Sequence, residues 1–349
     1  MSLEKNTIGV LRLSALGDAV LVVPMIHDLI NAKVFDEVTW ITTSQVHELI
    51  GPIKGCRYII IEKINSLGSA LKNWQKLRAE SFDKLIVAQA SFSAHAISLM
   101  ISARSRIGFD QRRGKDLHGL FVNQKIEYRN EHFIEAYLSM AKLAGVSSGT
   151  NKPDYSLAFK HLDKDWAQSY RVERRPLVAL HPHPSKEERR WICSRYRSLV
   201  SSLVQRGCRV LILGGTGVIE YKLNQEILEG SSEDALNLTG SLSLMQWASL
   251  LSEVDLLVAP DTGAIHLANA LGTPVVGLFA VANPYLTGPY QKLEHSINKY
   301  PDAIRNFGKG NATDFHDRVH DSRAMRLIKF NEVWDKVTEL LDLLKVDER

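Results

Sequence analysis

Residues 258–279 combine a polar turn with the start of a helix, and their types suit the binding of a charged ligand. An apolar run leads into Asp261, Thr262 and Gly263, and a helical pattern opens at Ala264. The first N–H groups of a helix lack acceptors and lie at the positive end of its dipole, so they favour an anion. Gly263 allows close approach of the backbone, and Thr262 adds a hydroxyl donor. This arrangement suits a diphosphate that carries a sugar, although Asp261 and Thr262 could equally be the caps of an ordinary strand-to-helix turn.

Asp18 stands where a catalytic base could be placed. Residues 12–18 follow the first apolar run of the chain and precede a helical pattern that begins at Ala19. In an open parallel sheet, ligands bind at the carboxyl ends of the strands, so Asp18 is expected at the rim of the first domain. A carboxylate there can take a proton from an attacking hydroxyl. Aspartate is also a common helix N-cap, and position alone does not separate the two roles.

Two further segments offer polar side chains for a nucleotide. The first follows the strand that ends near residue 181, and the side chains that could reach a phosphate are Ser185, Lys186, Arg189 and Arg190. The second contains Gly215-Thr-Gly217, half of a dinucleotide fingerprint, and then Glu220 in place of its last glycine. Glu220 could accept hydrogen bonds from ribose hydroxyls, or it could be an ordinary surface glutamate of a helix.

Two patterns resemble metal sites, and we interpret neither as one. His181 and His183 have no nearby carboxylate pattern, which makes a poor ligand set. Asp163 and Asp165 form the Asp-x-Asp pair that holds a divalent ion in metal-dependent sugar transferases, but here the pair reads as the polar first turn of a helix. No metal and no cofactor are therefore expected.

A basic segment at residues 104–115 suits an anionic partner. Its cations are Arg104, Arg106, Arg112, Arg113 and Lys115, against the single acid Asp110. Such a segment fits a phosphorylated glycan, a membrane surface or a nucleic acid, or it is simply a solvated loop. The chain has no RNP-like aromatic stretch and no zinc-finger spacing, so no nucleic-acid partner is expected.

Buried apolar runs alternate with helical patterns and predict two α/β domains. Strands are expected at residues 8–13, 38–42, 58–61 and 85–90, then at 177–181, 209–213, 236–238, 256–259 and 275–279. Helices are expected at residues 19–31, 69–80, 93–102, 196–205 and 244–252. In the second of these, Leu71, Trp74 and Leu77 predict a buried stripe. The last helix, near residues 331–344, has an apolar face that either domain could cover.

Length and composition agree with a soluble protein of two domains. The chain has 349 residues, of which 45% are apolar and 23% charged. Its three cysteines show no framework spacing, and its start lacks a signal-peptide pattern, so a cytoplasmic protein is expected. Residues 85–103 lack charges but hold too many polar groups for a membrane span.

Taken together, these motifs resemble glycosyltransferase family 9, the bacterial ADP-heptose:lipopolysaccharide heptosyltransferases. Residues 12–18, with Arg12, Ser14, Gly17 and Asp18, look like the family's N-terminal signature. Residues 261–268 with 272–275 look like its C-terminal signature, and residues 106–110 with 120–121 are similar to a segment between them. The resemblance covers nearly the whole chain.

The resemblance implies a GT-B fold, with two facing Rossmann-like domains and a cleft between them. It implies an acceptor domain at residues 1–160, a sugar-nucleotide domain at 161–330, and a helix at 331–349 that packs back on the first domain. It also implies inverting, metal-independent transfer of heptose from ADP-heptose to the lipopolysaccharide inner core. The enzyme would work in the cytoplasm, in peripheral contact with the inner membrane.

In that reading, Asp18 matches the proposed base. The residues that would bind the donor are Arg189, Glu220, Asp261, Thr262, Gly263 and His266. The alternative for His266 is a purely structural role. The anionic acceptor would meet Arg12, Ser14, Arg112, Arg113 and Lys115. Removing one donor of a hydrogen bond to developing charge typically costs about 3 kcal/mol of barrier.

Three alternative functions stay open. Residues 280–284 differ from the family's usual Gly-Pro-Thr-x-Pro, and Pro182 and Pro184 stand where hydroxyl residues often bind phosphate, so transfer of a hexose or another sugar is an alternative. A nicotinamide-dependent oxidoreductase would need a glycine fingerprint after the first strand, where only Gly17 occurs. A non-catalytic glycan-binding relative would have no need of Asp18.

Overall fold

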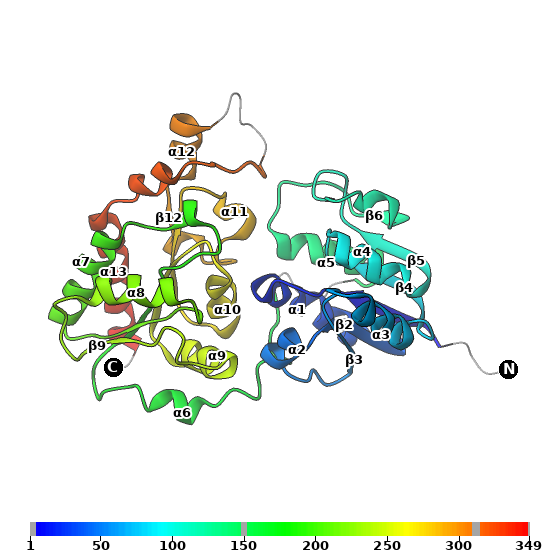
Figure 1. Ribbon diagram of the computed structural model, residues 1–349, viewed down its shortest axis with the longest axis horizontal. Coiled ribbons are helices and arrows are strands. Elements are labelled where there is room, and N and C mark those ends of the chain that lie inside the picture. Colours follow the sequence, from blue (N-terminus) through cyan, green and yellow to red (C-terminus); the bar gives the residue numbers. More distant parts are fainter. Residues whose placement is uncertain (1–4, 148–151, 309–314, 348–349) are drawn as a thin grey trace. The chain divides into compact units, whose positions relative to one another are not determined.

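The computed structural model describes residues 5–147, 152–308 and 315–347. The chain forms two compact units, residues 1–161 and 162–349, each built around a parallel sheet of six strands (Figure 1). Both units follow the alternation of strand and helix that the sequence predicts.

The sheet of the first unit has the order β3-β2-β1-β4-β5-β6. Its strands are β1 (Thr7–Leu11), β2 (Glu37–Thr43), β3 (Cys56–Ile61), β4 (Ser81–Val87), β5 (Ser102–Gly108) and β6 (Gln124–Lys125). The helices are α1 (Leu16–Asn31), α2 (Ser44–Ile50), α3 (Leu67–Leu77), α4 (Phe92–Leu99) and α5 (Phe133–Leu143), and η1 (His118–Leu120) is a 3₁₀ turn. The strand order reverses between β1 and β4, and a ligand site is expected beside such a point.

The sheet of the second unit has the order β12-β11-β10-β7-β8-β9. Its strands are β7 (Leu177–Leu180), β8 (Arg209–Ile212), β9 (Ala235–Asn237), β10 (Leu256–Pro260), β11 (Val275–Phe279) and β12 (Ile297–Asn298). The helices are α6 (Lys164–Gln168), α7 (Cys193–Gln205), α8 (Val218–Leu228), α9 (Leu244–Glu253), α10 (Gly263–Leu271), α11 (Pro284–Thr287), α12 (Tyr300–Phe307) and α13 (Phe330–Asp347). The 3₁₀ turns are η2 (Glu187–Arg189), η3 (Leu293–His295) and η4 (Ser322–Leu327).

The last helix, α13, buries its apolar face in the core of the second unit. Val333, Val337 and Leu341 lie in one cluster with side chains of β7, β10 and β11. Their spacing of four residues keeps them on one face of the helix, so that face is used by the second sheet. The expectation that residues 331–349 pack back on the first domain is therefore wrong for these side chains.

Two expectations for the first unit are also corrected. The predicted helix over residues 93–102 ends at Leu99, and Ser102–Gly108 forms β5 beside β4. In α3, Leu77 is buried as expected, but Leu71 and Trp74 are exposed. The buried line of that helix consists of Ser69, Asn73 and Leu77 instead.

No helix in residues 5–147, 152–308 or 315–347 is both long and apolar enough to cross a membrane.

Candidate active site

The loop after β1 holds an ion pair at the carboxyl edge of the first sheet. Nη2 of Arg12 lies 2.6 Å from Oδ2 of Asp18, with the Arg12 side chain 7% exposed and that of Asp18 48% exposed. Nη1 of Arg12 donates to the carbonyl of Ala88 at 2.8 Å and to the hydroxyl oxygen of Tyr137 at 2.9 Å. Burial raises the pKa of Tyr137 to about 12, so the phenol stays neutral. These contacts fix the guanidinium and, through it, one oxygen of a solvent-accessible carboxylate.

Asp18 is not an N-cap. The N-cap of α1 is Ala15, which has no side-chain cap, and Asp18 is the third residue of the helix. Its position adds the positive end of the helix dipole to the charge of Arg12. The N-cap alternative that the sequence left open is thus excluded by the observed geometry.

Gln89 fixes the backbone that leads from β1 into α1. Its Oε1 accepts the N–H of Leu13 at 2.9 Å and that of Ser14 at 3.2 Å. Thr42 donates its hydroxyl to the carbonyl of Arg12 at 2.7 Å. The turn is therefore built by side chains of β2 and of the loop after β4, and it presents Ser14 and Asp18 at the same edge.

The basic segment separates into structural and accessible cations. Nη2 of Arg106 donates to the carbonyl of Ile101, two residues after the end of α4, at 2.7 Å, so this guanidinium is held by the protein's own backbone. The guanidinium of Arg113 is buried, contacts the carboxylate of Asp110 and lies 2.8 Å from Oε1 of Glu131. Because these carboxylates enclose it, Arg113 has no surface for an acceptor, and that predicted role is corrected.

Arg112 and Lys115 reach the surface of the same segment. The Arg112 guanidinium lies over the ring of Tyr128, 4.6 Å from its centroid, in a cation–π contact. These two cations are the members of the predicted acceptor set that remain accessible here.

The turn between β10 and α10 has the predicted form of an anion site. Thr262 occupies the N-cap position, but its hydroxyl makes no cap, and α10 begins at Gly263. The Thr262 Oγ1 atom is buried and has no hydrogen-bond partner among the described residues. Buried polar groups are nearly always paired, so an orphaned hydroxyl beside the start of a helix indicates a place for a ligand atom.

Asp261 is held beside this turn by a buried cation. Nη1 of Arg189 lies 3.1 Å from Oδ2 of Asp261, and both side chains are about one-tenth exposed. The same nitrogen donates to the Asp261 carbonyl at 3.3 Å, and Thr287 donates its hydroxyl to Oδ1 at 3.4 Å. The Nε atom of Arg189 is buried with no partner among the described residues, so this guanidinium keeps a donor for a further acceptor.

His266 is buried in the first turns of α10. Burial alone does not separate packing from a contact with the donor, so the donor-binding role of His266 stays a prediction.

Glu220 closes the glycine loop that follows β8. Its Oε2 accepts the N–H of Gly215 at 2.8 Å. A Cβ atom at Gly214 would lie 2.9 Å from a carbon of Thr239 and 3.2 Å from Oε2 of Glu220, so this position has little room for a side chain. Glu220 is thus neither a detached surface residue nor, in this geometry, a fully available acceptor.

A buried chain of hydrogen bonds lies next to that loop. Nε2 of His183 lies 2.7 Å from Oδ1 of Asn224, whose Nδ2 donates to Oγ1 of Thr239 at 2.6 Å. Desolvation lowers the pKa of His183 and lowers that of His181 to about 4. Both imidazoles are therefore neutral at physiological pH. Within the described residues, no group of three or more His, Cys, Asp or Glu side chains could hold a metal ion.

The Asp-x-Asp pair lies at the start of α6, as expected. Asp163 is the N-cap and accepts the N–H of Trp166 at 2.9 Å, while Asp165 lies in the first turn. Asp163 therefore caps the helix, and Asp165 has a position that complements the helix dipole.

Sequence reasoning missed Gln89, Tyr137 and Thr287. Gln89 carried a signal, since it is a polar residue at the end of an apolar run. Tyr137 and Thr287 carried none, because they reach the site from 125 and 26 residues away in the chain.

Comparison with known proteins points to one family of enzymes. The sequence model of glycosyltransferase family 9 (heptosyltransferase) matches residues 70–314. The lipopolysaccharide core heptosyltransferase OpsX of Haemophilus influenzae is 30% identical over 306 residues, which cover 87% of this chain and 88% of that protein. Lipopolysaccharide heptosyltransferase 2 of Escherichia coli is 23% identical over 75% of this chain and 78% of its own.

Solved structures share the fold. The glycosyl transferase family 9 protein of Veillonella parvula superposes with a TM-score of 0.78 at 19% identity, covering 98% of both chains. The E. coli heptosyltransferase WaaC with ADP gives a TM-score of 0.71 at 19% identity, covering 96% of this chain and 99% of WaaC. The extent of the sequence match and the two Rossmann-like units lead to one assignment: this chain belongs to glycosyltransferase family 9, the heptosyltransferase family.

Proposed function

We propose that this enzyme transfers heptose from ADP-heptose to the inner core of lipopolysaccharide, with inversion at the sugar carbon and without a divalent metal. The observation that carries the proposal is the turn at α10, where Arg189 and Thr262 each keep a buried polar atom with no partner among the described residues, beside the first N–H groups of the helix. The similarity to a lipopolysaccharide core heptosyltransferase and to a structure of WaaC with ADP supports the choice of substrates.

The first unit would activate the acceptor. Arg12 holds one oxygen of Asp18, and the half-exposed carboxylate is left to take the proton of an acceptor hydroxyl. The new bond joins that oxygen to the anomeric carbon as the bond from this carbon to the diphosphate breaks. Arg112 and Lys115 would meet the phosphates and carboxylates of the acceptor.

The second unit would hold the donor and its leaving group. Negative charge builds on the diphosphate as it departs, and the N–H groups of Gly263 and the next residues, with Thr262 and Arg189, would stabilise it. Asp261 would accept hydrogen bonds from the hydroxyls of the sugar. Glu220 would exchange its bond to Gly215 for a ribose hydroxyl of the nucleoside.

Thermal unfolding with ADP, UDP, GDP and CMP at matched concentrations tests the donor. A ligand at about 100 times its Kd adds about 2.7 kcal/mol, which raises the midpoint by a few degrees. A shift with ADP alone supports the proposal, whereas a shift with UDP alone would favour transfer of a hexose, and no shift would favour a non-catalytic protein.

A transfer assay with ADP-heptose and a delipidated core oligosaccharide tests the reaction. We expect product of inverted anomeric configuration by NMR, and the same rate after treatment with EDTA. Retained configuration would refute the single displacement, and a rate abolished by EDTA and restored by a divalent ion would refute the metal-free mechanism.

A further inference from the structure

Helix α3 exposes its apolar side chains and buries its polar ones. Leu67, Leu71 and Trp74 are 91%, 54% and 43% exposed. Ser69 and Asn73, on the opposite side, are buried. Spacings of four and three residues place the three apolar side chains on one stripe of the helix.

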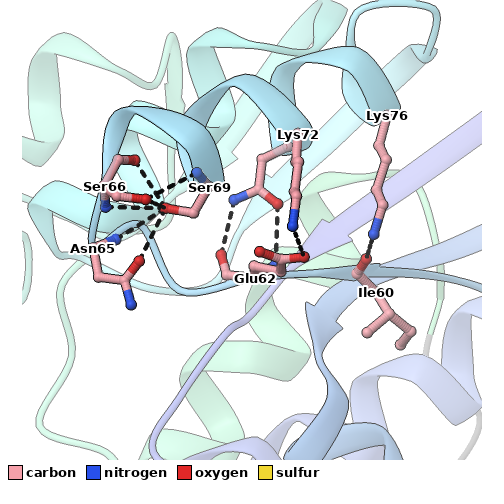
Figure 2. A network of polar contacts seen from close by, with 8 residues as sticks. Ile60, Glu62, Asn65, Ser66, Ser69, Lys72 and Lys76 are labelled. Atoms are coloured by element: carbon pink, nitrogen blue, oxygen red, sulfur yellow. Dashed lines mark hydrogen bonds and ion pairs between the residues drawn. The ribbon is translucent and has the colours of Figure 1, made fainter.

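Polar contacts to the strand end beneath fix this orientation (Figure 2). The backbone N–H of Glu62 donates to Oδ1 of Asn73 at 3.0 Å, and Nδ2 of Asn73 donates to the Glu62 carbonyl at 2.8 Å. Lys76 donates to the carbonyl of Ile60 at 3.0 Å, and Ser66 and Ser69 form a capping box. The helix is therefore anchored with its apolar stripe facing solvent, and that stripe is not a surface left over from loose packing.

The same layer of the first unit exposes further apolar side chains. Helices α3 and α4 both contribute to one core cluster with the strands they cover. On its outer side, α4 exposes Phe92 and Leu99, seven residues apart. The neighbouring η1 segment exposes Leu117 and Leu120.

The η1 segment is attached firmly to α4. Nε2 of His95 lies 2.9 Å from Nδ1 of His118, and the ring of Phe121 stacks on His95 at 4.4 Å. Asp116 and Leu117 both have positive φ, 53° and 60°, a conformation that a bulky side chain adopts at a cost. The turn thus holds Leu117 outward on a fixed support.

The charges of this surface are predominantly positive. Helix α3 contains Lys72 and Lys76 and no acid, and α4 contains no Asp, Glu, Lys or Arg. Between residues 112 and 125 the exposed charges are three cations, Arg112, Lys115 and Lys125, against Asp116, while Arg113 is buried and paired with Asp110 and Glu131.

We propose that this surface, formed by the outer sides of α3, α4 and η1, docks on an anionic lipid bilayer. Exposed Leu, Phe and Trp side chains beside Lys and Arg are the composition of an element that lies in a membrane interface. Acidic headgroups attract the cations, whereas a second copy of the same basic surface would repel them. An apolar area of this kind marks an interaction site.

Part of this surface lies near the edge of the sheet at which Asp18 would meet a lipid-linked acceptor. This step of the inference rests on the proposed function. The chain enters α4 from the carboxyl end of β4 and reaches η1 from the carboxyl end of β5. Asp18 follows the carboxyl end of β1 in the same parallel sheet. The start of α4 and the η1 segment therefore lie near the carboxyl edge of the sheet that also carries Asp18.

Flotation of the full chain with vesicles tests the proposal. We expect at least tenfold stronger binding to vesicles of phosphatidylglycerol and phosphatidylcholine than to phosphatidylcholine alone, with loss at high salt. Leu71→Gln with Trp74→Gln should weaken binding at least tenfold, and Lys72→Gln with Lys125→Gln should remove the preference for the anionic lipid. The matched control is Val218→Gln with Ile219→Gln in α8, whose side chains are 69% and 73% exposed, and it should bind as the parent does.

Equal binding of the parent, the α3 variant and the control would overturn the proposal, as would no binding to either vesicle. A parent that sediments as a dimer, and becomes monomeric in the Leu71→Gln, Trp74→Gln variant without vesicle binding, would instead assign the surface to a second copy. Vesicle binding needs neither donor nor acceptor, so it stands or fails separately from the proposed transfer. If the transfer exists, the α3 variant should keep the parent rate on the water-soluble oligosaccharide.

Discussion

The Nη2 atom of Arg12 lies 2.6 Å from Oδ2 of Asp18, so a buried cation orients a carboxylate that solvent and substrate can reach. Arg12 is itself fixed by Ala88 and Tyr137, which makes the direction of the carboxylate a property of the folded sheet rather than of a flexible side chain. A base that is held in advance loses no free energy to being positioned during the reaction.

Asp18→Asn keeps the shape of this side chain and removes its basicity. We expect turnover to fall about 100- to 10,000-fold, the usual contribution of a general base, while the thermal shift with ADP is kept. Glu48→Gln, at an exposed carboxylate of α2, serves as the control and should keep the parent rate. Normal turnover in Asp18→Asn would remove this residue as the base.

Thr262→Val tests the orphaned hydroxyl at α10. Because Oγ1 of Thr262 makes no hydrogen bond to the described residues, its replacement by a methyl group should leave the free energy of unfolding within about 0.5 kcal/mol of the parent. Turnover should fall about 100-fold if the hydroxyl stabilises the leaving diphosphate.

The matched control is Thr273→Val, at the other end of α10. Oγ1 of Thr273 donates to the carbonyl of Leu251 at 2.6 Å in a buried position. This variant should lose about 1–3 kcal/mol of stability and keep its kcat. The opposite pattern, a stability loss at Thr262 with unchanged turnover, would make Thr262 structural.

The Arg189–Asp261 pair should behave as a buried ion pair. Arg189→Met leaves the Asp261 carboxylate without its cation, and we expect urea unfolding to show a loss of about 3–5 kcal/mol. The double variant Arg189→Met, Asp261→Leu should recover much of that stability and still fail to respond to ADP. Parent-like stability of the single variant would show that the pair is not coupled.

Sequence patterns predicted most of this fold because buried parallel strands are continuous apolar runs. Residues 8–13, 177–181 and 256–259 all became central strands. The sequence patterns missed β5 and the two-residue strands β6 and β12. In β5, Arg104 and Arg106 interrupt the apolar pattern, and one of the two neighbours of this strand is the short β6. Propensity cannot find such a strand, because its pairing with β4 determines it.

The site was predictable in its positions and not in its contacts. The rule that ligands lie at the carboxyl ends of strands located Asp18 and Thr262. It could not show that Gln89 builds the turn at Ser14, from 75 residues away, or that Glu131 neutralises Arg113. Local charge counts overestimate the accessible cations when the partner acid is distant in sequence.

In helix α3, replacing a polar side chain by an apolar one should destabilise the protein more than the opposite replacement. Asn73→Leu adds an apolar side chain at a fully buried position, yet it removes both hydrogen bonds to the backbone of Glu62 and should cost about 2 kcal/mol or more. Leu71→Gln removes an apolar side chain and should change stability by no more than about 0.5 kcal/mol. Differential scanning calorimetry of the two variants decides between this geometry and a buried apolar stripe, which would give the reverse order.

Acid should destabilise the protein through its buried histidines. Burial lowers the pKa of His118 and of His181 to about 4, whereas a histidine of the unfolded chain titrates near 6.5. As the pH falls from about 6.5 to 4, the unfolded state binds protons that the folded state does not, so stability present above that window is lost within it. His181→Phe keeps an aromatic ring at the buried site and should reduce the drop in urea midpoint between pH 7 and pH 5. His320→Gln, at an exposed position, should leave that drop as in the parent; a parent whose midpoint does not change between these pH values would contradict the neutral, buried state of both rings.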